Sequence, residues 1–487
     1  MFCENDTSFF CPLTGGFHDG TDNIFIVANR LPVEYDSKTG WRGSPGGLVS
    51  ALEPALQNIN TTWVGWRGSP VPEGSPDERI RLRKHTADIC IAEIRMTQEE
   101  VNCFYDGVCN AALWPLYHDA AIDPVFCDDE FKHYRGINQR FADQVAETAQ
   151  QDALVWVHDY HLQLVPALLR EARPDLCIGF FLHVPFPSPA RFDELPWKKR
   201  IMRGLLGANL IGFQTSSSLE HFLEAACISG EATCVGRTLI LDEPLGERRV
   251  AVDVFPVGPD SSRYISLAAK TEVRASAAKI VSHFNEPELI LLGVDRLDYT
   301  KGIDIRIRAV TDLLKSEPFK ERDIQYIQVA MPSRSNLLAY QKLRRQVEET
   351  LSLANAELVA LGIRPIHYIY DALSTEQVVA LYVAADVMLV TSLADGMNLV
   401  SKEFIACQQK SHSRLVLSNT TGAAAQLREA WLVDPFDVED LKRGISEAIR
   451  ACADEARDRM ARLNQTVASA DAKHWVETFL ARLREAG

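Results

Sequence analysis

The sequence predicts an α/β protein in which two doubly wound domains face a cleft. Short apolar runs rich in β-branched residues alternate with helical stretches along almost the whole chain. Near-continuous apolar strands between helices are typical of parallel sheets that are covered on both faces. The alternation restarts after about residue 260, and a chain of 487 residues is long enough for two or three domains.

Several apolar runs are expected to form the strands of the two sheets, because each is followed by a helical stretch. These runs cover residues 24–30, 153–159, 177–187, 209–215, 288–298, 324–333, 366–372, 386–392 and 414–420. In open α/β sheets, ligands bind at the carboxyl ends of the strands. Functional side chains are therefore expected directly after these runs.

Composition and spacing divide the chain into four expected segments. Residues 1–22 form an extension ahead of the first strand, and residues 23–260 and 261–465 form the two domains. The stretch around residues 256–275 is expected to cross between them. Residues 466–487 contain the helical run HWVETFLARLREAG, which is expected to pack back across the domain junction.

The composition argues against several classes of partner. The net charge is −15, from 51 basic and 66 acidic residues without a long Lys/Arg run, which disfavours nucleic acid or an anionic membrane. No apolar run approaches the roughly 18–20 residues of a membrane span, and the N-terminus lacks a signal-peptide pattern. The 11 cysteines form no CxxC pair, so we expect reduced thiols, a cytoplasmic protein and no metal site. A homo-oligomer is compatible with these features.

The first group of side chains that could carry chemistry lies in GVDRLDYTKG, residues 293–302. Arg296 and Lys301 follow a buried strand, at the edge of the sheet where ligands bind. Two cations on one strand-to-helix turn can hold a diphosphate and stabilise a leaving group without a metal ion. The alternative is a surface turn in which Arg296 pairs with Asp298, and the spacing alone does not separate the two.

The second group lies in TSLADGMNLVSKEF, residues 391–404. Asp395 is predicted to cap the helix that follows, with the free N–H groups of residues 396–398 at its start. Such a helix start is a ready site for an anion. Glu403, two turns further on, could accept hydrogen bonds from ribose hydroxyls. In the alternative, Asp395 only caps the helix and Glu403 is solvated surface.

A glycine-rich loop, residues 43–47, follows Arg30 at the end of the first strand. Gly46 and Gly47 would let the backbone approach a ligand closely, although most such loops are ordinary turns. The loop is not GxGxxG, which counts against a nicotinamide or flavin site.

Two strands are expected to end in histidines and an acid. His158 and Asp159 follow one apolar run, and His183 ends the next. A single histidine at a strand end is more often structural, but two such ends side by side favour a site for a sugar or an acceptor. Four further side chains are either core or the rim of a site on composition alone: Trp66, Tyr105, Trp114 and Arg334.

Taken together, these stretches resemble the trehalose-6-phosphate synthase family of retaining glycosyltransferases. The resemblance runs from about residue 23 to residue 480, with all motifs in the family's order. The motifs are NRLP, GGL, GWRG, NAALWP, VHDYHL, FLHVPFP, GFQT, DRLDYTKG, PSR…AYQKLRRQVE, DGMNLVSKEF and TGAA. The family implies the glycosyltransferase-B fold, with an N-terminal Rossmann-like acceptor domain and a C-terminal Rossmann-like donor domain.

The resemblance also implies roles for individual residues. The implied donor site comprises Gly47, Arg296, Lys301, Gly396, Met397, Asn398, Leu399, Val400 and Glu403. The implied acceptor site comprises Arg30, Trp66, Tyr105, Trp114, Asp159 and Arg334. The implied catalytic group comprises Arg296, Lys301, Asp395, His183 and Asp159, with His183 on the donor sugar and no metal ion.

The implied reaction transfers glucose from UDP-glucose or GDP-glucose to glucose 6-phosphate, with retention at the anomeric carbon and no cofactor. The family mechanism is front-face attack, in which the leaving phosphate takes the acceptor proton. Front-face attack is consistent with the sequence, because these motifs contain no pair of carboxylates suited to double displacement. The chain departs from the family at Ala394, where most relatives carry arginine, and at residues 371–374 (DALS), so the donor base stays open.

Three alternatives compete with this interpretation, two of them enzymes and one a protein without catalytic activity. A related synthase would use another acceptor, such as glycerol 3-phosphate or a cyclitol, but the complete acceptor set favours glucose 6-phosphate. A catalytically silent sugar-phosphate sensor would be expected to lose the cation pair or the loop acid, and both are present. A phosphorylase would need a cofactor lysine in a different context, and nothing in the sequence marks one.

Overall fold

The chain folds into two compact units in the computed structural model. One unit comprises Met1–Phe255 with Trp475–Gly487, and the other comprises Pro256–His474. The structure describes residues 9–12, 24–36, 40–43, 52, 61–84, 87–244, 246–334, 336–408 and 412–487. Gly46 and Gly47 of the predicted glycine loop lie outside the described residues, as does most of the extension at residues 1–22.

The sheet of the first unit has a parallel centre. Its parallel strands are, in spatial order, β13 (Gly246–Val254), β10 (Leu210–Phe213), β9 (Cys177–Phe181), β8 (Leu154–His158), β2 (Ile24–Arg30), β5 (Thr61–Trp66) and β7 (Ala87–Glu93). Six of the seven residues of β2 are buried, which explains why such strands are continuous apolar runs in the sequence. The four strands predicted in the first half of the chain are β2, β8, β9 and β10.

Antiparallel strands extend both edges of this sheet, a feature that the sequence analysis did not predict. They are β11 (Thr233–Val235) and β12 (Thr238–Glu243) at one edge, and β6 (Glu78–Lys84), β1 (Phe9–Pro12), β4 (Gly40–Gly43) and β3 (Val33–Asp36) at the other. The sequence of β6, ERIRLRK, alternates charged and apolar residues and so lacks the continuous apolar run of a central strand.

The helical segments of the first unit include a helix from the far end of the sequence. The segments are α2 (Gln98–Glu100), η1 (Val101–Leu113), α3 (Trp114–Tyr117), α4 (Asp128–Ala146), η2 (Tyr160–Leu162), α5 (Val165–Ala172), α6 (Pro189–Asp193), α7 (Lys198–Leu205), α8 (Ser216–Ser229) and α17 (Ala472–Ala486). Phe479 of α17 stacks on Trp156 of β8, with ring centroids 4.3 Å apart. A Cβ atom at Gly179 in β9 would lie 2.8 Å from the Phe479 ring, so glycine is required for this close approach.

The sheet of the second unit is parallel throughout. Its order is β16 (His367–Ile369), β15 (Ile324–Met331), β14 (Leu289–Arg296), β17 (Val387–Val390), β18 (Arg414–Ser418) and β19 (Trp431–Val433). The chain begins at the centre with β14, adds strands on one side and then returns to add β17 on the other. The carboxyl ends of β14 and β17 therefore flank the topological switch point, where open α/β sheets bind their ligands.

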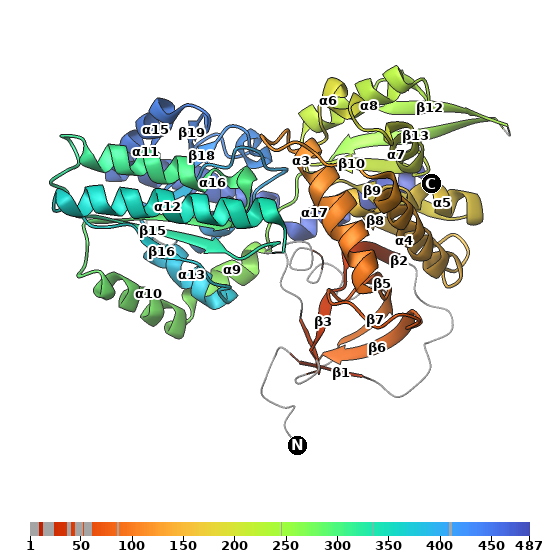
Figure 1. The fold of residues 1–487 in the computed structure, drawn as a ribbon, viewed down its shortest axis with the longest axis horizontal. Helices are drawn as coiled ribbons and strands as arrows, with labels where there is room; N and C mark the ends of the chain where they lie inside the picture. The colour runs from red at the N-terminus through yellow and green to blue at the C-terminus, as the bar shows by residue number, and fades with distance from the viewer. Residues whose placement is uncertain are drawn as a thin grey trace. The chain divides into compact units, whose positions relative to one another are not determined.

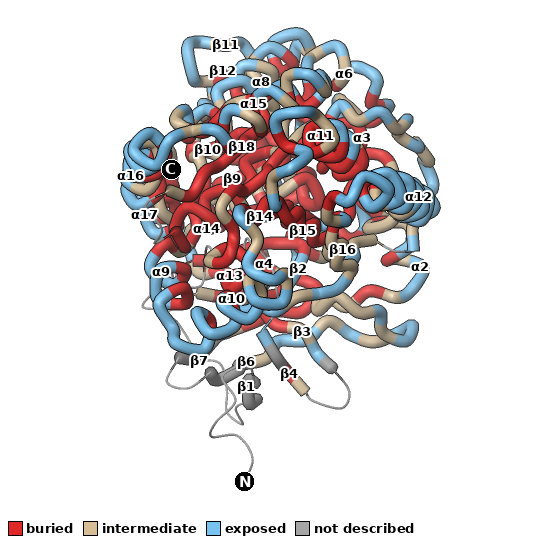
Figure 2. Tube along the Cα trace, turned by 90° about the vertical axis from the view of Figure 1, so that its left-hand side faces the viewer, coloured by how far each residue is buried: buried red, intermediate tan, exposed pale blue. Residues whose placement is uncertain are grey.

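Helices cover both faces of the second sheet (Figure 1). The helices on one face are α11 (Ile303–Lys315), α12 (Leu338–Ala360) and α15 (Val438–Arg450), which pack their apolar residues into a single core with β14, β15 and β17. The other helical segments are α9 (Ser261–Ala269), α10 (Thr271–His283), η3 (Tyr299–Lys301), α13 (Thr375–Ala384), α14 (Leu399–Cys407), η4 (Gly422–Ala425) and α16 (Ala453–Ser469). Figure 2 shows β14, β15 and β18 of this sheet buried and the outer side of α12 exposed.

Two further expectations concern the thiols and the membrane. Cys227 at the end of α8 and Cys234 in β11 form a disulfide, so the expectation of reduced thiols is wrong at this pair. The physical reason is that the chain turns back between helix and strand, which brings the two Cα atoms to 6.3 Å. Within the part of the chain that the structure describes, none of the helices has the length and apolar character needed to cross a membrane.

Candidate active site

The turn after β14 carries the two predicted phosphate-binding cations. Arg296 is the last residue of the strand and is exposed, whereas Lys301 ends η3 and is only 9% exposed. Asp298 holds the turn between them, because its Oδ1 accepts hydrogen bonds from the backbone N and the Oγ1 of Thr300, both at 3.0 Å. Gly302 follows in the left-handed region, with φ of 59°, and starts α11. The local chain thus places both cations on one short turn.

Asp298 makes a buried ion pair with Arg334, and the charge of Arg296 also acts on its carboxylate. A nitrogen of Arg334 lies 2.8 Å from Asp298 Oδ2, and the Tyr340 hydroxyl donates to the same oxygen at 2.8 Å. Burial alone would raise the pKa of Asp298, but the positive charges of Arg334 and Arg296 lower it. Asp298 is therefore a carboxylate that ties Arg334, a predicted acceptor residue, to the cation turn.

Arg306, in the first turns of α11, lies beneath this turn and was missed by the sequence analysis. Its side chain is fully buried and pairs with Asp295 Oδ2 at 2.5 Å. It also donates to Thr391 Oγ1 at 2.7 Å and to the backbone oxygen of Lys301 at 3.3 Å. Arg306 therefore connects the carboxyl ends of β14 and β17 to the residue that carries the second cation. The signal in the sequence is an arginine three residues after Ile303, on the apolar side of the helix.

The loop after β17 brings Asp395 to Lys301. Lys301 Nζ lies 2.5 Å from Asp395 Oδ2, and Asn398 Nδ2 donates to the same oxygen at 3.1 Å. Both side chains of the ion pair are largely buried, at 11% and 18% exposed. The two motifs singled out in the sequence thus meet at the switch point of the sheet, through residues 94 positions apart in the chain.

The prediction that Asp395 caps α14 is wrong. The helix begins at Leu399, and its N-cap is Asn398, whose Oδ1 accepts from Ser401 N at 3.0 Å. Asn398 has φ of 81°, a left-handed conformation that asparagine tolerates better than most residues. Asp395 cannot serve as the cap because it lies three residues before Asn398 and its carboxylate is turned to Lys301. The helix start therefore consists of the backbone N–H groups of Leu399 and Val400.

The backbone of the loop is fixed by the segment after β18. Gly422 N donates to Asp395 O at 3.1 Å, and Ala423 N donates to Met397 O at 2.8 Å. Asp395 also forms an isolated parallel bridge with Thr421. These contacts give the predicted TGAA motif a structural role, because they hold Gly396 and Met397 between two fixed points.

Glu403, on the second turn of α14, lies among tyrosines. The Tyr382 hydroxyl donates to Glu403 Oε2 at 3.3 Å, and the carboxyl is only partly exposed. Burial raises the pKa of Glu403, while hydrogen bonds from Tyr264 and Tyr382 oppose that change. The alternative that Glu403 is solvated surface is therefore wrong.

Lys402, the neighbour of Glu403, is a buried lysine that fixes α14 to the start of the second unit. It is 2% exposed and donates to Val257 O and to Gln426 Oε1, both at 2.6 Å. Burial lowers the pKa of Lys402 to about 7. Its folded pKa therefore lies below its ordinary value of 10.5, and the unfolded chain binds more protons between these two limits.

We expect the free energy of unfolding to rise with pH in that window. Relative to Lys402→Met, the wild type should gain about 2 kcal/mol between pH 7 and pH 9, since each unit of pKa difference corresponds to about 1.4 kcal/mol. Urea titrations of both proteins at pH 7, 8 and 9 measure this difference. Lys279→Met, at an exposed lysine of α10, is the matched control and should leave the pH dependence unchanged. A parallel pH dependence in wild type and Lys402→Met would contradict the assignment.

The first unit brings three predicted acceptor residues together. The guanidinium of Arg30 lies over the Trp66 ring, 4.7 Å from its centroid. The Trp66 and Tyr105 rings are 5.7 Å apart, and Tyr105 stacks parallel to His161 at 6.0 Å. Arg30 is exposed while Trp66 is buried, so an aromatic wall lies beneath a cation. Such a combination suits a phosphorylated sugar, since the ring packs on the sugar and the guanidinium binds phosphate.

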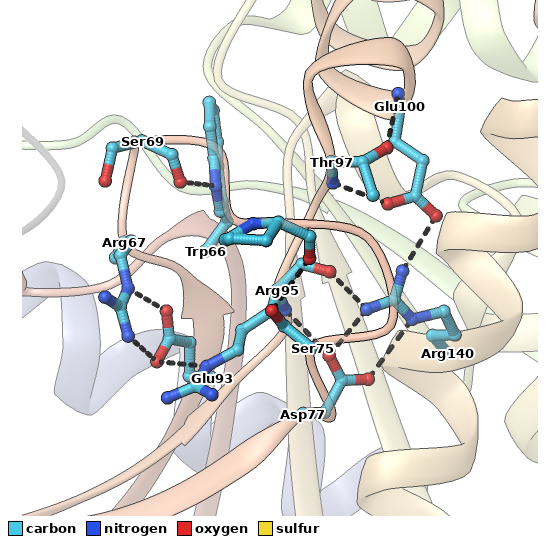
Figure 3. A network of polar contacts seen from close by, with 11 residues as sticks. Trp66, Arg67, Ser69, Ser75, Asp77, Glu93, Arg95, Thr97, Glu100 and Arg140 are labelled. Atoms are coloured by element: carbon cyan, nitrogen blue, oxygen red, sulfur yellow. Dashed lines mark hydrogen bonds and ion pairs between the residues drawn. The ribbon is translucent and has the colours of Figure 1, made fainter.

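A network of charged side chains supports this wall (Figure 3). Glu93, which is fully buried at the end of β7, accepts from Arg67 and, at 3.3 Å, from Arg95. Arg140 of α4 pairs with Asp77 at 2.5 Å and with Glu100 at 3.0 Å. These pairs tie the end of β5 to the start of η1, the two elements that carry Trp66 and Tyr105.

Trp114 reaches the same cluster through ring contacts. Its ring lies 5.7 Å from that of Tyr160, which is 4.0 Å from the His161 ring that stacks on Tyr105. The Tyr160 hydroxyl donates to Asn110 Oδ1 in η1 at 3.1 Å, and this hydrogen bond holds the Tyr160 side chain to η1.

Asp159 and His183 form a second cluster at the ends of β8 and β9, which are neighbours as predicted. Asp159 has φ of 73°, and its Oδ1 accepts from the backbone N of His183 at 3.2 Å. His158 Nδ1 lies 3.1 Å from His183 Nε2. In the described ranges, no group of three or more His, Cys, Asp or Glu side chains is arranged to hold a metal ion.

Comparison with known proteins identifies the family. The model of glycosyltransferase family 20 matches residues 22–485. The trehalose-6-phosphate synthase of Mycolicibacterium paratuberculosis (strain ATCC BAA-968 / K-10) is 41% identical over 483 residues, 97% of each chain. The trehalose-6-phosphate synthase of Mycobacterium leprae (strain TN) is 42% identical over 479 residues, 96% of each chain.

Solved structures agree with these sequence matches. An α,α-trehalose-phosphate synthase (UDP-forming) from Burkholderia xenovorans, in complex with glucose-6-phosphate, has a TM-score of 0.85 at 28% identity and covers 95% of this chain and 100% of its own. An E. coli structure bound with UDP-2-fluoro glucose has a TM-score of 0.83 at 29% identity, with 94% and 98% covered. The expected glycosyltransferase-B fold and family resemblance are confirmed. The chain belongs to glycosyltransferase family 20.

Proposed function

We propose that this chain is a trehalose-6-phosphate synthase that transfers glucose from a nucleoside-diphosphate glucose to glucose 6-phosphate with retention of configuration. The observation that carries the proposal is the ion pair between Lys301 and Asp395. It joins the two predicted donor motifs at the switch point of the second sheet, where a nucleotide sugar would bind. The relatives bound with a UDP-sugar and with glucose-6-phosphate support both substrate classes.

We assign the binding of the donor substrate to the second unit. Arg296 and Lys301 would bind the diphosphate, and Asp395 would contact the donor sugar while its pairing keeps Lys301 in place. The helix start at Leu399 and Val400 would add backbone N–H groups to the phosphate, since such groups carry partial positive charge. Further donor contacts are assigned to Gly47, Gly396, Met397, Asn398 and Glu403, the last on the ribose.

We assign most of the contacts with the acceptor substrate to the first unit. Arg30 would bind the phosphate of glucose 6-phosphate, with the sugar packed along Trp66 and Tyr105. Further acceptor contacts are assigned to Trp114, Asp159 and Arg334, and His183 is assigned to the donor sugar.

The proposed mechanism is front-face attack. The acceptor hydroxyl attacks the anomeric carbon from the side of the leaving group, and its proton passes to the leaving phosphate oxygen. The chain would contribute electrostatic stabilisation, because the cation pair would lie beside the oxygen on which charge develops. We propose that neither a metal ion nor a cofactor takes part.

A turnover assay tests the function and the donor base together. Purified protein is incubated with glucose 6-phosphate and, in turn, UDP-, GDP-, ADP- or TDP-glucose, and the release of nucleoside diphosphate is measured. We expect release that requires glucose 6-phosphate, with UDP-glucose or GDP-glucose preferred. Binding of glucose 6-phosphate without turnover on any donor would identify a silent sensor and overturn the proposal. Turnover only with glycerol 3-phosphate or a cyclitol would point to a related synthase.

The raised pKa of Glu403 predicts how donor affinity changes with pH. The carboxylate accepts hydrogen bonds from ribose hydroxyls on both oxygens, whereas protonation turns one oxygen into a donor and removes the charge. The KM for the donor should therefore rise as pH falls through the raised pKa. Tyr382→Phe removes one hydrogen bond that opposes the shift, so the rise should begin at higher pH in this variant. Donor KM between pH 5 and pH 8 measures both, and Tyr370→Phe, outside this contact, serves as control. Identical profiles for wild type and Tyr382→Phe would contradict the role of Glu403.

A further inference from the structure

His158 and His183 form a contact that the proposed mechanism does not yet use. The Nδ1 atom of His158 and the Nε2 atom of His183 are 3.1 Å apart, and the ring planes differ by 31°. His158 is fully buried at the end of β8, whereas His183 is partly exposed. At this distance the two nitrogens form a hydrogen bond only if one carries a hydrogen and the other a lone pair.

Both rings are neutral at neutral pH. Burial lowers the pKa of His158 well below its ordinary value, and the proximity of His183 lowers it further. Burial also lowers the pKa of His183, to about 3. Each ring therefore carries one hydrogen on nitrogen, at either Nδ1 or Nε2. Because the two rings share a hydrogen bond, the tautomer of one ring determines the tautomer of the other.

Two arrangements satisfy the contact. In the first, His158 carries its hydrogen on Nδ1 and donates it, so His183 accepts on Nε2 and carries its own hydrogen on Nδ1. In the second, His183 donates from Nε2, and His158 must then carry its hydrogen on Nε2. The two arrangements differ in what is buried at Nε2 of His158: a lone pair in the first and an N–H group in the second.

The surroundings of His158 favour the first arrangement. Its Nε2 atom is buried and has no hydrogen-bond partner among the residues that the structure describes. The rings of Trp156 and Trp475 pack against His158, with centroids at 4.6 and 6.3 Å, and an indole nitrogen is a donor only. An N–H group at this position would have no acceptor among the residues that the structure describes, and orphaned N–H groups are rarer in proteins than under-used acceptors.

We propose that His158 is a positioning residue that fixes His183 as the tautomer with its hydrogen on Nδ1. His183 then offers an N–H group, rather than a lone pair, to a hydroxyl oxygen of the donor sugar. The backbone of His183 is also held in place, because its N–H group donates to Asp159 Oδ1 at 3.2 Å. The inference deepens the proposed function, because it rests on the assignment of His183 to the donor sugar.

Three substitutions at position 158 separate this role from packing. His158→Leu removes the donor, and we expect kcat/KM for the donor to fall about 2- to 10-fold, the worth of one neutral hydrogen bond. His158→Asn keeps an N–H donor at the same bond distance from Cβ and should recover most of the loss. His158→Gln, which moves the amide one bond further out, is the mismatched control. Equal loss in the Leu, Asn and Gln variants would show a packing role only and overturn the proposal.

The tautomer itself is measured by two-bond proton–nitrogen NMR correlations on protein labelled with ¹⁵N-histidine. The His183 signals are assigned by their loss in His183→Gln. We expect a protonated Nδ1 and an unprotonated Nε2 in the wild type and in His158→Asn, with a changed pattern in His158→Leu. A protonated Nε2 in the wild type would overturn the proposal. This measurement needs no turnover, so failure of the synthase assay and failure of the inference are distinguishable.

Discussion

Replacing Arg296 by alanine is expected to lower kcat by about 100-fold or more. Arg296 ends β14 at the switch point of the second sheet, five residues from Lys301 on the same turn. In the proposed mechanism, charge develops on the leaving phosphate, and removing one of two cations leaves that charge under-stabilised. Arg296→Lys should recover only part of the rate, because an ammonium group cannot replace the planar two-pronged contact of a guanidinium with phosphate.

The loss should be confined to catalysis. Arg296 is exposed, and substitutions at such positions usually change stability by less than about 0.5 kcal/mol. Arg308→Ala, at a largely exposed arginine of α11 that pairs with Asp304, is the matched control and should keep the wild-type rate. A near wild-type kcat in Arg296→Ala, in a folded protein, would show that the leaving group is stabilised elsewhere.

Replacing Arg306 by methionine is expected to destabilise the second unit by about 3–5 kcal/mol. The substitution leaves the carboxylate of Asp295, which is 4% exposed, buried without its main positive partner. It also removes the hydrogen bonds to Thr391 Oγ1 and to Lys301 O, so kcat should fall in the fraction that remains folded. Urea unfolding measures the stability, and turnover at low temperature measures the rate.

The double variant Arg306→Met/Asp295→Leu provides the control for charge burial. If the loss in Arg306→Met comes mainly from the uncompensated carboxylate, the double variant should be more stable than the single variant, because no buried charge remains. Its kcat should stay low, since the anchor on Lys301 is still absent. A double variant less stable than Arg306→Met would contradict this account.

The parallel strands of both sheets could be predicted because burial on both faces produces continuous apolar runs. β14 and β17 are examples, and each lies within the run predicted for it. The edge strand β6 could not be found this way, because its charged and apolar residues alternate. Its pairing with β7 depends on contacts between segments that local pattern does not record.

The residues around the cation turn show the limits of local signals within the site. Asp395 followed by Gly396 has the composition of a helix cap, but the carboxylate is directed to Lys301 and the cap falls to Asn398. The partner that decides this lies 94 residues earlier in the chain, so no local pattern could reveal it. The sequence does contain a weak indication of Arg306. An arginine on the apolar side of a helix indicates a buried ion pair.

The central claim is that this chain joins an activated glucose to glucose 6-phosphate with retention. The most direct test is the NMR spectrum of the product formed from UDP-glucose or GDP-glucose and glucose 6-phosphate. We predict one disaccharide phosphate, linked through both anomeric carbons with the α configuration at each, formed in equal amount to the released nucleoside diphosphate. A β configuration at the carbon that comes from the donor, or consumption of donor without any glucose 6-phosphate in the product, would contradict the account.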